Sequence, residues 1–285
     1  MGSARGSVQL AGATLEYSVE GAGIPLLVPG SSIYYPRTFS ASLRESCALI
    51  CADLPHFVPL PTEFDFRRIS FDLYSECIDA VRADAGIDRV VVMGHSHHGN
   101  VALEYAKRRP EAVSHLVLIG TPPVDVATTI QSAEQYWEAY ASAERKAALQ
   151  RRRQPTESDV SQSHSEEYVR QYDTDAPLYW NDPTYDASWL WRGMSFSMEA
   201  VHAFRNLYRS YDIDWNATLR SIPVLVVMGV NDFAVPHTLW NTFVPRVENI
   251  TFQLLGHSGH TPQLEEPDAF NRILLSWLTN EGALA

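Results

Sequence analysis

One ten-residue segment, from Val90 to Gly99, constrains the fold of this chain more than any other. Four apolar residues, three of them β-branched, end at a glycine, and Ser96 then stands between histidines before a second glycine. A helical pattern begins directly afterwards. β-Branched residues favour strands, and glycines permit a sharp turn with close approach of backbone segments. The segment therefore predicts a buried strand, a tight turn with Ser96 at its tip, and a helix.

This arrangement is typical of a nucleophile elbow, in which a strained turn pushes a hydroxyl out at the edge of a sheet. A serine in that position is rarely there for packing. One position departs from the pattern, because a small residue is expected two places after the serine and the chain has His98 there. His98 must either widen the gap between strand and helix or point into a pocket. A substitution that simply packs beside the elbow is an equally good interpretation.

Short apolar runs alternate with helical patterns along most of the chain, which is typical of a mostly parallel sheet with helices on both faces. Two opening runs on either side of Gly12 predict an antiparallel hairpin. Apolar residues that share one helical face predict helices around Tyr74, Tyr105 and Trp277. Buried strands are expected at 25–29, 48–53, 90–93, 115–120, 223–229 and 250–255. The predicted fold class is therefore α/β.

The alternation of strand and helix disappears after the strand at 115–120. Helical segments rich in tryptophan and tyrosine replace it, and a polar stretch at 154–167 is typical of a loop. The strand–helix pattern then resumes and completes the same sheet, so two tandem domains are not expected. We expect residues 1–120 and 220–285 to form one α/β core, with residues 121–219 inserted as a helical cap.

Charge, cysteine content and the length of the apolar runs exclude several classes of protein. A net charge of −12 argues against nucleic acid or an anionic membrane as a partner. Three cysteines are too few, and odd in number, for a disulfide scaffold. No apolar run is long enough to cross a bilayer, and the N-terminus lacks the apolar stretch of a signal peptide. We therefore expect a soluble cytoplasmic protein that acts on a small molecule, and the sequence leaves a homodimer open.

Two later loops carry groups that could activate the serine. A serine hydroxyl needs a histidine to take its proton and a carboxylate to orient that histidine. Asp232 and His260 each follow a predicted strand, and loops at the carboxyl ends of parallel strands meet at one edge of a sheet. The order Ser96, Asp232, His260 is the triad order of a fold with a nucleophile elbow. Asp125 is the alternative acid and His257 the alternative base.

These three loops resemble the α/β-hydrolase superfamily, and the resemblance covers nearly the whole chain. The stretch Ser-Gly-His-Thr-Pro-Gln-Leu-Glu-Glu-Pro at 258–267 is similar to the catalytic-histidine loop of that family. Asp232 stands where the family has its catalytic acid, and the turn at 52–55 resembles its Asp-x-Pro-Gly loop. Within the superfamily, the elbow, the following helix and the aromatic insertion look most like proline iminopeptidase-like hydrolases. The resemblance implies an α/β-hydrolase fold with an inserted cap.

The resemblance also implies two backbone N–H donors for the negative charge that develops on a substrate carbonyl oxygen. One is expected at His97, at the N-terminus of the elbow helix. The other is expected at Ser31, in the loop where the family usually has His-Gly and this chain has Pro29-Gly30. The residues expected to contact substrate, from this loop, the elbow and the cap, are Ser32, Tyr34, Tyr35, His98, Trp137 and Trp180.

Together these features predict a serine hydrolase in which His260, oriented by Asp232, deprotonates Ser96 and an acyl-enzyme forms. An aromatic cap favours a small apolar or aromatic carboxylic ester or lactone, and the chemistry requires neither a metal nor an organic cofactor. One alternative is an aminopeptidase that releases N-terminal proline, which would need cap carboxylates to bind the substrate ammonium. The candidates for such carboxylates are Glu134, Glu138, Asp173, Asp175 and Glu199.

A second alternative follows from the Ser-His-His-Gly stretch, which also resembles the elbow of cofactor-free dioxygenases on this fold. In those enzymes a His/Asp pair, here His260 and Asp232, deprotonates the substrate and the serine is not acylated. A lyase such as a hydroxynitrile lyase would share that logic. A ligand receptor without catalytic activity is the last alternative.

Overall fold

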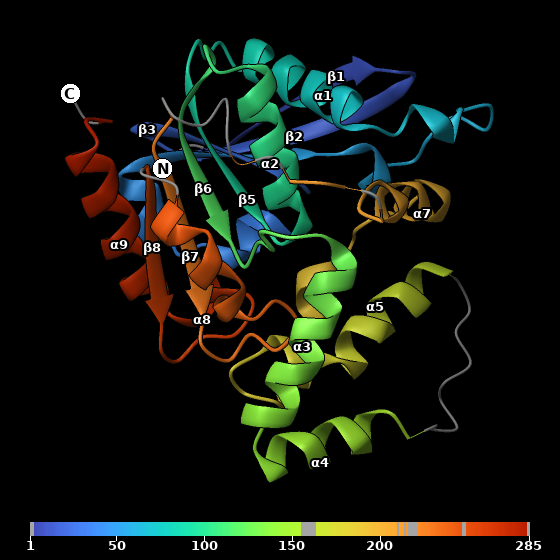
Figure 1. Ribbon diagram of the computed structural model, residues 1–285. Coiled ribbons are helices and arrows are strands. Elements are labelled where there is room, and N and C mark those ends of the chain that lie inside the picture. Colours follow the sequence, from blue (N-terminus) through green and yellow to red (C-terminus); the bar gives the residue numbers. More distant parts are fainter. Residues whose placement is uncertain are drawn as a thin grey trace.

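A computed structural model describes residues 3–154, 164–209, 211–213, 215, 222–246 and 249–283. An eight-stranded sheet runs through this described part in the order β1-β2-β4-β3-β5-β6-β7-β8 (Figure 1). The strands are β1 (Ser3–Leu10), β2 (Ala13–Gly21), β3 (Ile24–Gly30), β4 (Cys47–Asp53), β5 (Val90–His95), β6 (Val113–Ile119), β7 (Val224–Gly229) and β8 (Ile250–Leu255). The pairs β1–β2 and β2–β4 are antiparallel, and all other pairs are parallel. The predicted α/β fold class is confirmed.

The opening hairpin forms where the sequence predicts it. Its register pairs Leu10 with Ala13, so the turn consists of Ala11 and Gly12 alone. Both turn residues have positive φ angles, 52° and 83°, as a two-residue turn between twisted strands requires. Glycine adopts such angles without steric penalty, which explains the signal that it provides in the sequence.

Helices cover both faces of the sheet. The long helices of the α/β part are α1 (Phe71–Asp84), α2 (His97–Arg108) and α9 (Pro267–Asn280), and the short α8 (Pro262–Glu265) precedes α9. Short 3-10 helices lie in the loops: η1 (Tyr35–Thr38), η2 (Ser42–Glu45), η3 (Pro55–Phe57), η4 (Phe66–Arg68), η5 (Ser188–Trp191), η7 (His237–Thr242) and η8 (Val244–Arg246). In Figure 1, α1 and α2 lie together on one side of the strands and α9 lies on the other.

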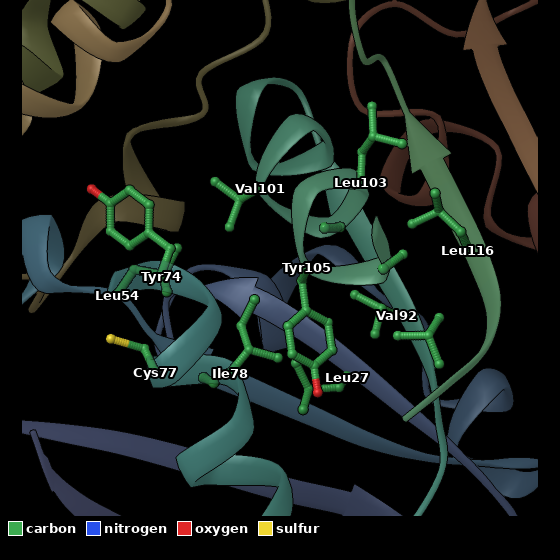
Figure 2. Packing of buried hydrophobic residues seen from close by; sticks show 14 of the residues in the cluster. Leu27, Leu54, Tyr74, Cys77, Ile78, Val92, Val101, Leu103, Tyr105 and Leu116 are labelled. Carbon is green, nitrogen blue, oxygen red and sulfur yellow. The ribbon is translucent and has the colours of Figure 1, made fainter. Parts of the chain in front are cut away.

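Successive residues of the central strands supply two separate cores, because side chains alternate between the faces of a strand. Val92 of β5 packs in the core beneath α1 and α2, whereas Val91 packs with Leu274 of α9 in the other core. Figure 2 shows the first core, in which side chains of α1 and α2, among them Ile78 and Tyr105, pack over the strands. The sheet is thereby held rigid beneath the loops at its carboxyl edge.

Five α-helices lie between β6 and β7 in the described part of the chain: α3 (Val126–Tyr140), α4 (Ala143–Arg152), α5 (His164–Thr174), α6 (Ala176–Tyr179) and α7 (Met198–Leu207). Figure 1 shows α3, α4 and α5 beyond the carboxyl ends of β5, β6 and β7, and α7 close to α2. The prediction of a loop at 154–167 is wrong for its last residues, because α5 already begins at His164. Residues 155–163 of that loop lie outside the described residues.

None of the helices described here combines the length and the apolar composition that a membrane span requires. Each of the three cysteines, Cys47, Cys51 and Cys77, is a buried free thiol. Their burial raises the pKa of each thiol, so that the uncharged form packs in the interior.

Candidate active site

Ser96 lies at the tip of the turn between β5 and α2, in a strained conformation. Its φ is 55° and its ψ is −135°, a combination that is costly for a residue with a side chain. Its N–H donates to the carbonyl oxygen of Ile119 at 2.8 Å, and its own carbonyl accepts from Gly99 at 2.9 Å. These hydrogen bonds to β6 and α2 therefore stabilise the strained backbone and present the hydroxyl at the edge of the sheet.

His260 and Asp232 form a buried hydrogen-bonded pair. The Nδ1–H of His260 donates to Oδ2 of Asp232 at 2.6 Å, and Asp232 is fully buried. Oδ1 of this carboxylate accepts the N–H groups of Ala234 at 3.0 Å and Val235 at 2.8 Å. With the proton on Nδ1, the Nε2 atom of His260 keeps its lone pair and can accept a proton. His260 lines the same cavity as Ser96.

The alternative acid and base have other partners. Asp125 caps α3, because its carboxylate accepts from the N–H of Thr128 at 2.9 Å and from the Thr128 hydroxyl at 2.6 Å. His257 is exposed, and its backbone N–H donates to Glu266 at 2.8 Å. Neither Asp125 nor His257 lines the cavity.

Two glutamates hold the loop that carries His260. Glu265 accepts the N–H of Gly259 at 2.9 Å, and Glu266 accepts the hydroxyl of Ser258 at 2.6 Å. Burial raises the pKa of Glu265 to about 7. On the other side, Nε2–H of His95 donates to the carbonyl oxygen of His260 at 2.8 Å. Hydrogen bonds from these side chains thus hold the loop both just before His260 and at His260 itself.

The expected oxyanion donors lie in two different elements. Ser31 follows β3, and its hydroxyl accepts the N–H groups of Ile33 and Tyr34, each at 3.1 Å. Asp53 holds the same loop by accepting the N–H of Ser32 at 2.6 Å. His97 opens α2, where the first N–H groups of a helix have no partner within that helix. Both Ser31 and His97 line the cavity.

A cavity open to solvent lies over Ser96. It brings together most of the residues that the sequence predicts for the site: Ser31, Tyr34, Tyr35, Ser96, His97, His98, Trp180 and His260. Asp232 lies behind His260. Ser32 and Trp137 are not part of the lining, since the N–H of Ser32 turns to Asp53 and the ring of Trp137 packs 5.4 Å from that of Phe233.

Several lining residues were not predicted from the sequence. They are mostly aromatic and come from the inserted helices and from η3: His56, Phe57, Tyr168, Tyr172, Tyr179, Trp191 and Phe204. The spacing of Tyr168 and Tyr172, four residues apart on α5, is a signal that could have placed both on one helix face. His56 gave no such signal, because its role depends on distant partners.

The histidines around the elbow are uncharged near neutral pH. Burial lowers the pKa of His95 and of His56 to about 3 and that of His97 to about 4. The pKa of His98 is lowered well below its ordinary value for the same reason. Among the described residues, no group of three or more His, Cys, Asp or Glu side chains is arranged to hold a metal ion.

This chain is similar to several known hydrolases. The family model described as alpha/beta hydrolase fold matches residues 28–267. The chain is 28% identical over 273 residues to AB hydrolase superfamily protein YclE of Bacillus subtilis (strain 168), covering 94% of this chain and 96% of that protein. It is also 28% identical over 275 residues to 2-hydroxymuconate semialdehyde hydrolase of Pseudomonas putida, covering 93% and 90%. Among solved structures, proline iminopeptidase of Mycobacterium smegmatis is similar, with a TM-score of 0.68, 18% identity and 98% of each chain covered.

Proposed function

Because this chain belongs to the α/β-hydrolase fold family, we propose that it is a serine hydrolase that cleaves small apolar or aromatic carboxylic esters or lactones. One observation carries the proposal. Ser96, in its strained turn, shares a cavity with His260, whose other ring nitrogen is bonded to the buried Asp232 at 2.6 Å. This is the arrangement that a nucleophile, its base and the group orienting that base require.

In the proposed reaction, Nε2 of His260 takes the proton of the Ser96 hydroxyl while Oγ attacks the substrate carbonyl carbon. The negative charge on the carbonyl oxygen is stabilised by the N–H groups of Ser31 and His97. His260 then gives its proton to the leaving alkoxide, and an acyl-enzyme remains. Water attacks the acyl carbon with His260 as base, and the acid product and free Ser96 are released.

The walls of the cavity support an uncharged substrate. Aromatic rings from the inserted helices make up much of the lining, and the neighbouring histidines are neutral. Asp173 is the one carboxylate among the described lining residues, and its Oδ1 accepts from Arg152 at 3.1 Å. An aminopeptidase would need a free carboxylate for the substrate ammonium, so this feature favours an ester or lactone over a peptide. We also propose that residues 121–219 act as a cap over a core of 1–120 and 220–285.

A fluorophosphonate probe tests the proposal. We expect a stable adduct on the wild-type protein, detected by mass, and none on Ser96→Ala. Hydrolysis of p-nitrophenyl esters should be lost in the same variant, and proline amides should be poorer substrates than esters. If Ser96→Ala kept most of its activity on a true substrate while His260→Ala lost it, His260 and Asp232 would serve a dioxygenase or lyase without an acyl-enzyme. If neither variant mattered, the proposed site itself would be wrong.

A further inference from the structure

Four side chains form one continuous hydrogen-bonded chain beside the proposed nucleophile; Tyr35, His56 and Tyr74 are buried and His98 is half-buried. The hydroxyl of Tyr35 lies 2.7 Å from Nδ1 of His98, and Nε2 of His98 lies 2.9 Å from Nε2 of His56. Nδ1 of His56 lies 3.1 Å from the hydroxyl of Tyr74. The chain joins η1, α2, η3 and α1, and it engages every ring nitrogen of both histidines. His98 is therefore not free to act as a base toward substrate.

Each imidazole in this chain carries a single N–H, because burial keeps both rings neutral. Only one proton can lie between the two facing Nε2 atoms of His56 and His98. Consequently, the donors in the chain must all point in the same direction. Either they run from Tyr35 toward Tyr74, or they run from Tyr74 toward Tyr35.

Both tyrosines are buried, but Tyr35 lines the cavity and Tyr74 does not, and this difference selects the second direction. Tyr74 is fully buried, and His56 is the one hydrogen-bond partner of its hydroxyl among the described residues. If the donors ran toward Tyr74, its hydroxyl proton would be buried without an acceptor, which is unfavourable. If they run from Tyr74, its proton is used, and Nδ1–H of His98 donates to the hydroxyl oxygen of Tyr35.

The hydroxyl proton of Tyr35 is then not used within the chain. Tyr35 lines the cavity that contains Ser96, and its ring packs against Gly30, directly before the proposed oxyanion donor Ser31. A Cβ atom on Gly30 would lie only 2.3 Å from Cε2 of Tyr35, so the glycine is what permits this packing. His98, the partner of Tyr35, directly follows His97, the other proposed donor.

We propose that Tyr35 determines specificity by donating a hydrogen bond from its hydroxyl to an oxygen atom in the acyl group of the substrate. The preferred substrates are then esters of acids that carry an ether, hydroxyl or carbonyl oxygen near the scissile carbonyl. His98, His56 and Tyr74 are positioning residues that keep Tyr35 a donor. This inference rests on the proposed hydrolase function, since it assumes that an acyl group occupies the cavity.

Matched esters separate recognition by Tyr35 from a purely structural role. The p-nitrophenyl esters of pentanoic, ethoxyacetic and 3-methoxypropanoic acid have acyl chains of equal length and differ in where one oxygen replaces a methylene. In Tyr35→Phe, kcat/KM for at least one oxygen-containing ester should fall roughly two- to tenfold more than for the pentanoate. If Tyr35 only supported the structure and did not contact the substrate, its substitution would lower all three kcat/KM values by the same factor. That result would overturn the inference.

Tyr105→Phe is the matched control. It removes a buried hydroxyl on α2 that donates to Asp79 at 2.7 Å outside the cavity lining, and should leave the three ratios unchanged. Thermal unfolding of each variant verifies that the protein is folded. If the wild type hydrolyses none of the esters and takes no fluorophosphonate label, the proposed function fails and the inference with it. If hydrolysis depends on Ser96 but Tyr35→Phe lowers kcat/KM equally for all three esters, only the inference fails.

Discussion

The backbone N–H of His260 donates to the carbonyl oxygen of Tyr179 at 2.6 Å. One residue earlier, the carbonyl oxygen of Leu178 accepts from the N–H of Phe233, next to Asp232, at 2.9 Å. A single short segment at the end of α6 is therefore bonded to both loops that carry the proposed base and acid. The relative position of these two side chains thus depends on how firmly that segment is held.

Arg145 holds the segment, and its removal should disturb catalysis from outside the cavity. Its buried guanidinium donates to the carbonyl oxygens of Pro177 and Trp180, each at 2.7 Å, and of Asn181 at 2.5 Å. In Arg145→Leu these three acceptors lose their donor, so we expect the free energy of unfolding to fall by about 2–4 kcal/mol. We also expect kcat for p-nitrophenyl pentanoate to fall. Urea unfolding and steady-state kinetics measure the two effects.

Arg151→Leu is the control for this prediction, because Arg151 is an exposed residue of the same helix, α4. Its substitution should change stability by less than about 0.5 kcal/mol and leave kcat unchanged. A destabilised Arg145→Leu protein with wild-type kcat would contradict the positioning role of the segment at 177–181.

The fold was predictable because its signals are local. Glycine in a two-residue turn, apolar runs and helical spacing each depend on neighbouring residues, and the hairpin and the parallel sheet follow from them. The start of α5 shows the limit of polarity as a signal. Glu166 and Glu167 make the stretch polar, yet acidic residues in a first turn favour a helix, so the loop predicted there was too long.

The cavity walls were less predictable, because they depend on packing between distant residues. The bulk of His98 indicated a pocket residue, but its partners lie 63 and 42 positions away in Tyr35 and His56. Trp137 was expected at the substrate from composition alone. The rotation of α3 instead directs its ring toward Phe233, a property that no local pattern reports.

Asp232 should be essential, whereas the alternative acid should not. In Asp232→Asn the amide no longer orients His260 as a carboxylate does, so kcat should fall roughly 10³- to 10⁴-fold. The matched variant Asp125→Asn keeps a good helix N-cap on α3 and should remain close to wild type in activity and stability. Steady-state kinetics on one ester decide between them. Loss of activity in Asp125→Asn instead would reverse the assignment of the acid.

Glu265 should make stability depend on pH. Burial raises its pKa to about 7 in the folded protein, above the value of about 4.3 for an exposed glutamate. The folded state therefore binds this proton more tightly, and the contribution of Glu265 to stability decreases as pH rises between these two values. Glu265→Gln removes the titration but keeps an acceptor for Gly259. Relative to wild type, it should gain on the order of 1 kcal/mol in unfolding free energy from about pH 5 to about pH 8.

Urea unfolding at several pH values measures this difference. The control is Glu134→Gln, on the exposed surface of α3, whose stability should follow that of the wild type at every pH. Parallel curves for Glu265→Gln and the wild type would show that Glu265 does not titrate in this range.

Gly94, near the end of β5 and two residues before Ser96, should not tolerate even a methyl group. A Cβ atom there would lie 2.4 Å from both Cα of Gly99 and the carbonyl oxygen of His98, and backbone atoms cannot move aside as a flexible side chain can. Gly94→Ala should therefore lose about 3 kcal/mol or more in unfolding free energy, measured with urea, and lose activity as the elbow shifts. Gly256→Ala, with no atom within 4 Å of the added carbon, should be as stable as the wild type or slightly more so. A Gly94→Ala protein with wild-type stability would mean that β5 and α2 do not approach closely, and the strained position of Ser96 would then need another cause.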